Sequence, residues 1–204
     1  MAISAAQKYD SPTRYAEPAM SLLAQRFDTP IGVLNIAVTD GGVCRVAFPV
    51  ELSGDWLRWF DRHFGELPRL GSSPLLVEAA WQIAQYLRGA RTQFTVPLDL
   101  RGTPFQLAVW QRLQEIPYGS TSSYSELARL MDLPRGARAV GSAIACNPVP
   151  IIVPCHRVVG SAGSLVGFGG GIELKERLLE LERARIPFTG AMELAESRDH
   201  LILR

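Results

Sequence analysis

The sequence predicts an α+β protein: a small N-terminal domain of strands and helices, followed by a mostly helical C-terminal domain with a helix-turn-helix. Apolar and polar residues alternate on both sides of Asp40-Gly41-Gly42, which is typical of a hairpin. Apolar residues then recur at helical spacing, and brief turns join successive helices in the second half. The predicted parts are a flexible tail over 1–20, an N-terminal domain over 21–100, a C-terminal domain over 101–188 and an extension over 189–204.

The predicted N-terminal domain contains one hairpin and two helices. The hairpin covers residues 31–49, and helical spacing marks 53–65 and 74–89, with Gly89 placed to end the second helix. Residues 92–102 read as a short strand that runs into a linker. Because no group of reactive side chains converges in residues 21–100, we expect this part to be structural.

Two capping boxes mark helix starts in the C-terminal domain. Thr103, with Pro104 at the first helical position and Gln106 three residues past the cap, begins one helix. Ser123 and Glu126 form the second box and begin the first helix of the helix-turn-helix.

The second helix of this motif is expected within residues 135–147, and it is rich in small residues. It carries Arg135 and Arg138 and no acidic residue. Its small side chains are Ala137, Ala139, Gly141, Ser142, Ala143 and Ala145. Such a helix fits close packing in a core, and it fits equally well an approach to a DNA groove.

Composition limits the classes of protein that remain. Among 204 residues, 47% are hydrophobic and the net charge is +1, which indicates a globular core and confines any nucleic-acid contact to a local patch. The three cysteines, Cys44, Cys146 and Cys155, are too few for a disulfide framework. No apolar run reaches the roughly 20 residues of a spanning helix, and the N-terminus lacks a signal-peptide core. We therefore expect an intracellular monomer, cytoplasmic or, in a eukaryote, nuclear, without membrane contact.

The segment "VPCHRVVG", residues 153–160, places a thiol beside an imidazole. A cysteine reacts as its thiolate, which needs a base or a positive charge nearby. His156 can supply the base and a carboxylate can orient it, but spacing alone leaves Glu173, Glu176, Glu180 and Glu182 open. The alternative is an inert buried thiol beside a surface imidazole. The glycine-rich stretch 160–171 follows and is able to wrap a ligand with its backbone N–H groups.

Residues 102–182 resemble the O6-alkylguanine-DNA alkyltransferases, also called methylated-DNA–protein-cysteine methyltransferases. The resemblance runs through "GTPFQLAVWQRLQEIPYG", "SYSELA", "RAVGSAIACNPVPIIVPCHRVVG" and "GFGGGIELKERLLELE". It implies transfer of an alkyl group from the ring oxygen of guanine in double-stranded DNA, approached through the minor groove, to Cys155. It also implies a flipped base, a single turnover and no cofactor, because the protein itself is the acceptor.

The resemblance also implies roles for individual residues. His156 is the base of Cys155 through a water, and Glu182 orients His156. Tyr124 contacts the flipped base and helps protonate the leaving guanine, and Arg138 fills the gap in the duplex. Asn147 is implied to brace the reactive segment, and Lys175 to hold the glycine-rich loop. The guanine pocket is implied to be lined by the backbones of Cys155, Val158 and Gly169. DNA contacts along the helix are implied for Arg135, Ala137, Gly141 and Ser142.

Some features depart from the family's pattern. Phe168 stands where some relatives carry a tyrosine, and Gly169-Gly170-Gly171 forms a pocket floor that varies among relatives, which leaves the preferred alkyl group open. Some relatives hold zinc in the N-terminal domain. Here Cys44, His63 and His200 do not cluster as ligands do, so we expect no metal. Cys44 is expected in the core, and Cys146 is expected to be shielded by its helix.

Three alternatives remain beside the alkyltransferase. An alkyltransferase-like protein binds lesions without transfer, but such relatives lack the acceptor cysteine. A helix-turn-helix regulator would carry polar base-reading side chains on its second helix, and this helix has few. A cysteine hydrolase generally pairs its nucleophile with a histidine distant in sequence.

Overall fold

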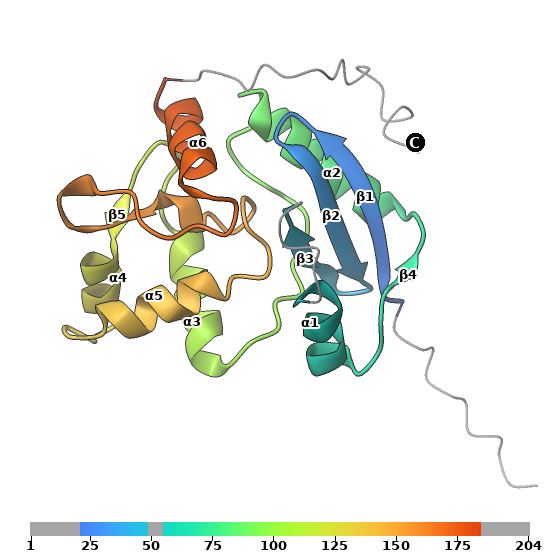
Figure 1. Cartoon of the computed structure of the whole chain (residues 1–204), viewed down its shortest axis with the longest axis horizontal. Helices are drawn as coiled ribbons and strands as arrows, with labels where there is room; N and C mark the ends of the chain where they lie inside the picture. Colours follow the sequence, from blue (N-terminus) through green and yellow to red (C-terminus); the bar gives the residue numbers. More distant parts are fainter. Residues whose placement is uncertain (1–20, 49–54, 185–204) are drawn as a thin grey trace, which may run out of the picture.

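The computed structural model describes residues 21–48 and 55–184. The predicted tail over 1–20, the extension over 189–204 and the last residues of the predicted C-terminal domain lie outside the described residues. The described part is mixed α and β, as predicted: a sheet with helices occupies one side of the molecule and a helical part with the helix-turn-helix occupies the other (Figure 1).

The sheet has four strands in the order β3-β2-β1-β4. These are β1 (Leu23–Thr29), β2 (Gly32–Thr39), β3 (Gly42–Ala47) and β4 (Arg69–Leu70). The first three pair antiparallel in sequence, and β4 joins β1 in parallel. The predicted hairpin is confirmed as β2 and β3. Strand β1 was not predicted, because its buried residues Ala24 and Phe27 break the period of two.

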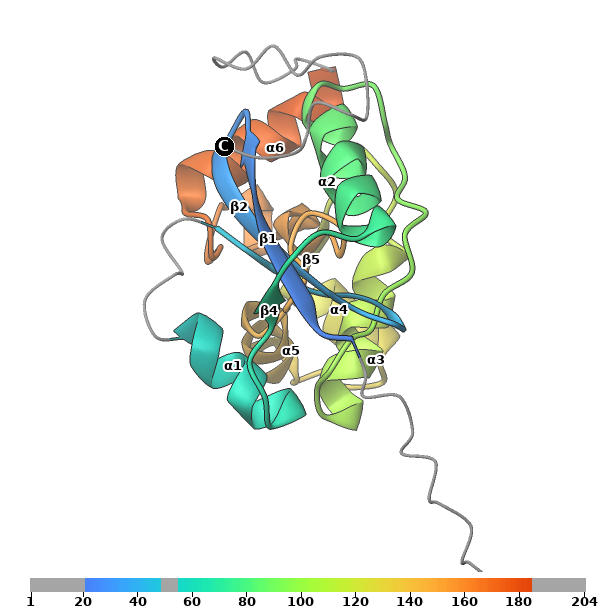
Figure 2. The same ribbon diagram turned by 90° about the vertical axis from the view of Figure 1, so that its right-hand side faces the viewer.

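One helix covers each face of the sheet (Figure 2). Helix α1 (Asp55–Phe64) buries Trp56 and Phe60 against Ala37 and Cys44. Helix α2 (Pro74–Leu87) packs on the opposite face, where Leu34, Ile36 and Val38 point. Gly89, with φ +71°, ends α2 as predicted, since a left-handed residue there is readily adopted by glycine.

The strand predicted over residues 92–102 is wrong. This segment is an extended connection that makes one isolated bridge, between Val43 and Leu98. Val43 donates its N–H to the Pro97 carbonyl at 2.8 Å, and its own carbonyl accepts from Asp99 N at 3.0 Å. Proline offers no N–H to extend the ladder.

The helical part contains α3 (Pro104–Gln114), α4 (Tyr124–Leu130), α5 (Ala137–Ala145) and α6 (Ile172–Ala184), with the short parallel pair β5 (Ser122–Ser123) and β6 (Val158–Val159). Single 3₁₀ turns, η2 and η3, cover Cys155–Arg157 and Ser161–Gly163. Both predicted capping boxes are present, at Thr103 and Ser123.

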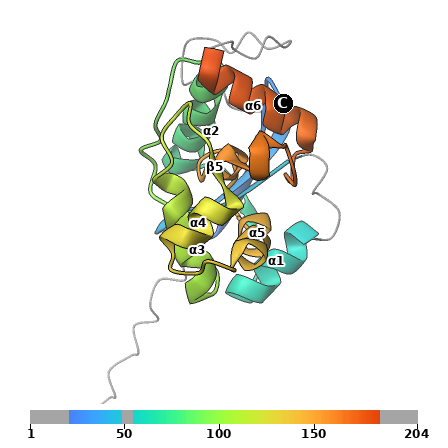
Figure 3. The same ribbon diagram turned by 90° about the vertical axis from the view of Figure 1, so that its left-hand side faces the viewer.

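Helices α4 and α5 form the helix-turn-helix and lie side by side at one end of the molecule (Figure 3). Arg135 lies in the turn before α5 rather than on the helix, because α5 begins at Ala137. One buried cluster extends from the sheet through α3 and α5 to α6, so the two parts share a hydrophobic core. No helix among residues 21–48 and 55–184 is long and apolar enough to cross a membrane.

Candidate active site

Cys155 lies in the 3₁₀ turn η2, which Asn147 holds in place. The Asn147 amide donates to the Val153 carbonyl at 2.9 Å, and its side-chain oxygen accepts from Val149 N at 3.0 Å. Within this clamped loop, Ile151 adopts φ +74°, a strained conformation for a β-branched residue. These two hydrogen bonds therefore tie the chain just after α5 to the segment that leads into η2.

A cavity of about 310 Å³ opens at Cys155, whose residue is only 7% exposed. Its walls come from α4, α5, the segment between α5 and η2, the glycine-rich loop and the residue that follows β3. The lining residues are Phe48, Tyr124, Gly141, Ile144, Ala145, Asn147, Pro150, Cys155, Gly167, Phe168 and Gly169. The volume is at the lower end of the range for small-molecule sites. The fold thus brings the predicted Tyr124, Phe168 and Gly169 around the thiol.

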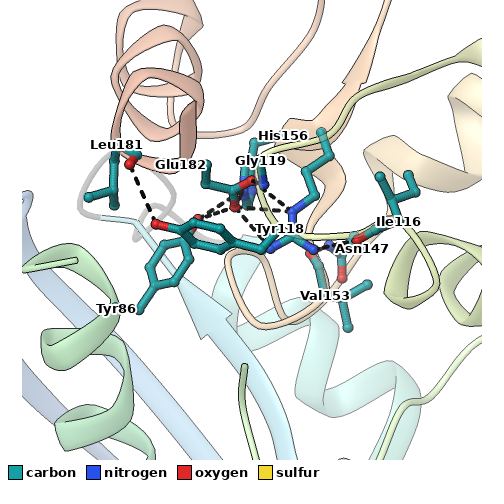
Figure 4. A network of polar contacts seen from close by, with 10 residues as sticks. Tyr86, Ile116, Tyr118, Gly119, Asn147, Val153, His156, Leu181 and Glu182 are labelled. Atoms are coloured by element: carbon teal, nitrogen blue, oxygen red, sulfur yellow. Dashed lines mark hydrogen bonds and ion pairs between the residues drawn. The ribbon is translucent and has the colours of Figure 1, made fainter. Parts of the chain in front are cut away.

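His156 lies beside the thiol in sequence, is fully buried, and points its Nε2 atom at Glu182. Nε2 is 2.9 Å from Glu182 Oε1 and 3.0 Å from the Tyr86 hydroxyl (Figure 4). The Tyr86 hydroxyl donates to the same carboxylate oxygen at 2.6 Å. An ionised carboxylate only accepts, so these partners assign the imidazole proton to Nε2.

Glu182 is held as a carboxylate by further donors. Arg157 donates to both its oxygens at 2.9 to 3.0 Å, and Gly119 N donates to Oε2 at 2.9 Å. Burial raises the pKa of Glu182, but the hydrogen bonds from His156 and Arg157 outweigh it and set the pKa at about 2. Among four candidate glutamates, the fold therefore selects Glu182.

Burial favours the neutral form of the His156 imidazole. Burial lowers its pKa, and this effect exceeds the opposing hydrogen bond and charge of Glu182. Its Nδ1 atom is buried and has no hydrogen-bond partner among the described residues. With the proton on Nε2, Nδ1 presents a free lone pair, which is what a base for the neighbouring Cys155 thiol requires.

Lys175 is buried and ties the glycine-rich loop to β6. Its ammonium donates to the Val158 carbonyl at 2.6 Å and to the Val166 carbonyl at 2.7 Å. Val158 is fully buried with its carbonyl bound by Lys175, and it is not among the described residues that line the cavity. The Tyr124 hydroxyl donates to the Val166 carbonyl at 3.3 Å, and burial raises the pKa of Tyr124.

The outer face of α5 is lined by small side chains. Arg138 and Ser142 are exposed, while Ala137 and Gly141 are half-buried. Gly141 faces the Tyr124 ring, and a Cβ there would lie 3.5 Å from it. Arg135 is exposed in the preceding turn. Apart from Arg138, the exposed residues of α5 are therefore all small.

The other two thiols differ from each other. Cys44 is buried, as expected, and burial raises its pKa to about 12. Cys146 is exposed, so the expectation that its helix shields it is wrong. It follows the last residue of α5, and its side chain lines a surface groove instead.

Sequence reasoning missed several residues of the site, three of which contribute large side chains. Arg157 immediately follows His156, and this position was a usable signal. Tyr86 on α2 and Phe48 after β3 come from the part expected to be only structural, and nothing near them in sequence marks them. Within residues 21–48 and 55–184, no three His, Cys, Asp or Glu side chains gather as a metal site requires.

Residues 104–184 match the family model described as 6-O-methylguanine DNA methyltransferase, DNA binding domain. The chain is 44% identical over 163 residues to the methylated-DNA–protein-cysteine methyltransferase of Mycolicibacterium paratuberculosis, covering 78% of this chain and 92% of that one. It belongs to the methylated-DNA–protein-cysteine methyltransferases.

Two further relatives of this family agree. The inducible methyltransferase of Bacillus subtilis is 49% identical over 135 residues, 66% of this chain and 74% of that one. The structure of Mycobacterium tuberculosis OGT in complex with DNA superposes with a TM-score of 0.70 at 42% identity, covering 81% of this chain and 95% of that one. Both parts of the fold are therefore those of a methyltransferase of this family.

Proposed function

We propose that this protein repairs DNA by moving an alkyl group, typically methyl, from the ring oxygen of guanine to the Sγ atom of Cys155. The observation that carries the proposal is the position of Cys155 at a cavity, next to an imidazole whose far nitrogen is fixed by Glu182. Membership of the family supports the class of substrate, and the position of the thiol at the cavity supports Cys155 as the acceptor.

In the proposed reaction, Nδ1 of His156 takes the thiol proton of Cys155 through a water molecule. The thiolate then attacks the alkyl carbon, a C–S bond forms, and the bond from carbon to the guanine oxygen breaks. The electron pair stays with guanine, which takes up a proton on leaving. The raised pKa of Tyr124 keeps its hydroxyl protonated, so it is available as the donor.

The same hydrogen bonds explain why Glu182 acts through His156. The carboxylate holds Nε2–H and so keeps Nδ1 as the basic atom, while Arg157, Gly119 and Tyr86 keep the carboxylate in place. We assign Tyr86 a positioning role, because its hydroxyl contacts both His156 and Glu182 without reaching the cavity lining.

DNA would lie against α5, and α5 would enter the minor groove of the duplex. A base within a stacked duplex cannot reach Cys155, so it must flip out at a cost of a few kcal/mol. Arg138 is exposed on α5 and is suited to fill the gap. Arg135, Ser142 and the small residues of α5 would contact the backbone and groove without reading sequence.

A thioether does not readily reverse, so each molecule would act once and need no cofactor. Because the proposed substrate is DNA, the protein would act inside the cell, and we propose that it acts as a monomer. Lesion binding without transfer is the weaker alternative, because the acceptor thiol is present at the cavity.

Incubation with methylated-guanine duplex followed by intact-mass and peptide mapping tests the proposal. We expect one methyl per protein, on Cys155, and none on the exposed Cys146. Cys155→Ser should bind DNA without gaining mass, while Cys146→Ser should react like the wild type. Multiple turnover, or methyl on Cys146, would overturn the proposal.

A further inference from the structure

A second concave surface lies next to the cavity, and nothing in the proposed chemistry uses it. It is a groove of about 680 Å³ between α1 and the helical part, and we call it the arginine groove. It shares Ala145 and Asn147 with the cavity, so it begins where the cavity ends. Its lining includes Arg45, Arg58, Trp59, Arg62, His63, Arg101, Gln106, Ala145, Cys146 and Asn147.

The arginine groove is positively charged. Arg45 comes from β3, Arg58 and Arg62 from α1, and Arg101 from the connection before α3. Among the described residues, Arg58 pairs with Asp55, Arg101 pairs with Asp99 at 2.7 Å, and no carboxylate lies within ion-pair distance of Arg62. Arg62 therefore brings to the groove a positive charge that no described carboxylate neutralises.

The pKa of His63 on α1 is affected by the same arginines. Burial lowers its pKa, and the nearby charges of Arg62, Arg45 and Arg101 lower it further. Arg45 also stacks over Trp59, with its guanidinium carbon 4.8 Å from the ring centroid. A concave surface whose lining has more basic than acidic side chains attracts anions.

The position of the arginine groove indicates which anion it meets. The C-terminal end of α5, Ala145 and Cys146, forms one wall, and the basic residues of α1 line the other. Helices α1, α3 and α5 lie at the same end of the molecule (Figures 1 and 3). The arginine groove therefore borders the helix on which the duplex would lie.

We propose that the arginine groove binds phosphates of the DNA strand that flanks the lesion, so that the N-terminal part contributes to DNA binding. The inference rests on the proposed function, since it needs a duplex on α5. These contacts go to the backbone. They therefore strengthen binding to normal and methylated DNA alike and do not take part in base flipping or transfer.

Arg62 is the residue to test, because it is exposed and its loss does not disturb the core. Duplex affinity is measured by fluorescence anisotropy over a sodium chloride series. For Arg62→Ala, the slope of log K against log [NaCl] should fall in magnitude by about one, and adding Arg58→Ala should lower it further. Arg69→Ala on β4, the edge strand opposite β3, is the matched control and should keep the wild-type slope.

The reaction with free alkylated guanine should be unchanged in these variants. A wild-type slope in the Arg58→Ala, Arg62→Ala double variant would overturn the proposal, as would an equal fall in the Arg69→Ala control. A wild-type protein that neither binds duplex nor gains a methyl group would instead contradict the proposed function, so the two failures are distinguishable.

Discussion

Glu182 is the residue on which the polar contacts of the site converge, and one of them comes from the N-terminal part. The Tyr86 hydroxyl lies 2.6 Å from Oε1 and is fully buried. Tyr86→Phe removes only this hydroxyl. Because the hydrogen bond from Tyr86 holds the Glu182 carboxylate, and that carboxylate fixes His156, we expect alkyl transfer to slow by about tenfold or more in this variant.

The pH profile separates positioning by Tyr86 from a general loss of packing. Tyr86 lowers the pKa of Glu182, so in Tyr86→Phe the fall of the rate in acid should begin at higher pH. Tyr118→Phe is the matched control, since its hydroxyl contacts the Leu181 carbonyl at 3.4 Å. Single-turnover rates across pH measure both variants. An unshifted profile in Tyr86→Phe would remove the positioning role.

Arg138 gives a second prediction for a single residue. A side chain that fills the gap left by a flipped base matters only when a duplex must be opened. Arg138→Ala should therefore slow transfer from methylated duplex while free alkylated guanine reacts at nearly the wild-type rate. Equal losses on duplex and free base would mean that Arg138 supports the fold or the cavity, and no change on either would mean a solvated surface residue.

At the scale of elements, Gly42 at the start of β3 allows the hairpin to approach closely the connection over residues 92–102. Gly42 has φ +151°, and a Cβ on it would lie 2.6 Å from the Pro97 backbone. Backbone cannot yield as a flexible side chain does, so Gly42→Ala must displace the connection that leads to α3. We expect a loss of about 1–3 kcal/mol of unfolding free energy beyond the cost of the backbone conformation.

Gly65 provides the control for Gly42, because its φ is +70° and a Cβ there would meet nothing within 4 Å. Gly65→Ala carries conformational strain without a clash, of about 1–2 kcal/mol. Urea denaturation of both variants isolates the steric part. If the two variants lose equal stability, the close approach of Gly42 to Pro97 does not constrain the fold.

The elements predicted correctly are those with local signals. Capping boxes at Thr103 and Ser123 depend on residues three apart, and the hairpin depends on a two-residue turn. The strand predicted over 92–102 was wrong because the residue that pairs with this segment, Val43, lies about fifty residues away in sequence. The same limit applies to the site: Cys155 and His156 are adjacent, whereas Tyr86 meets Glu182 only through the shared core.

At the scale of the whole molecule, that shared core places a neutral imidazole and a carboxylate between the two parts. Below about pH 6.5 the unfolded chain protonates His156, whereas burial lowers the pKa of this imidazole in the folded chain. The unfolded state then binds more protons, so stability falls as the pH drops through this range. Glu182 adds a second loss of stability below about pH 4.5, because the unfolded chain protonates this carboxylate there while the folded chain, with a pKa of about 2, does not.

We therefore expect two phases of acid destabilisation in urea denaturation from pH 8 to pH 3. His63 titrates in the same direction, so His63→Gln serves as the background in which the first phase is assigned. In that background, His156→Gln should remove most of the remaining first phase and leave a smaller second phase, because Arg157 and Tyr86 still lower the pKa of Glu182 after the hydrogen bond from His156 is lost. Should this variant not fold, nuclear magnetic resonance titration of the wild-type imidazole gives the answer directly. A His156 ring that protonates at its ordinary pKa while the protein stays folded would contradict a neutral base held between Cys155 and Glu182.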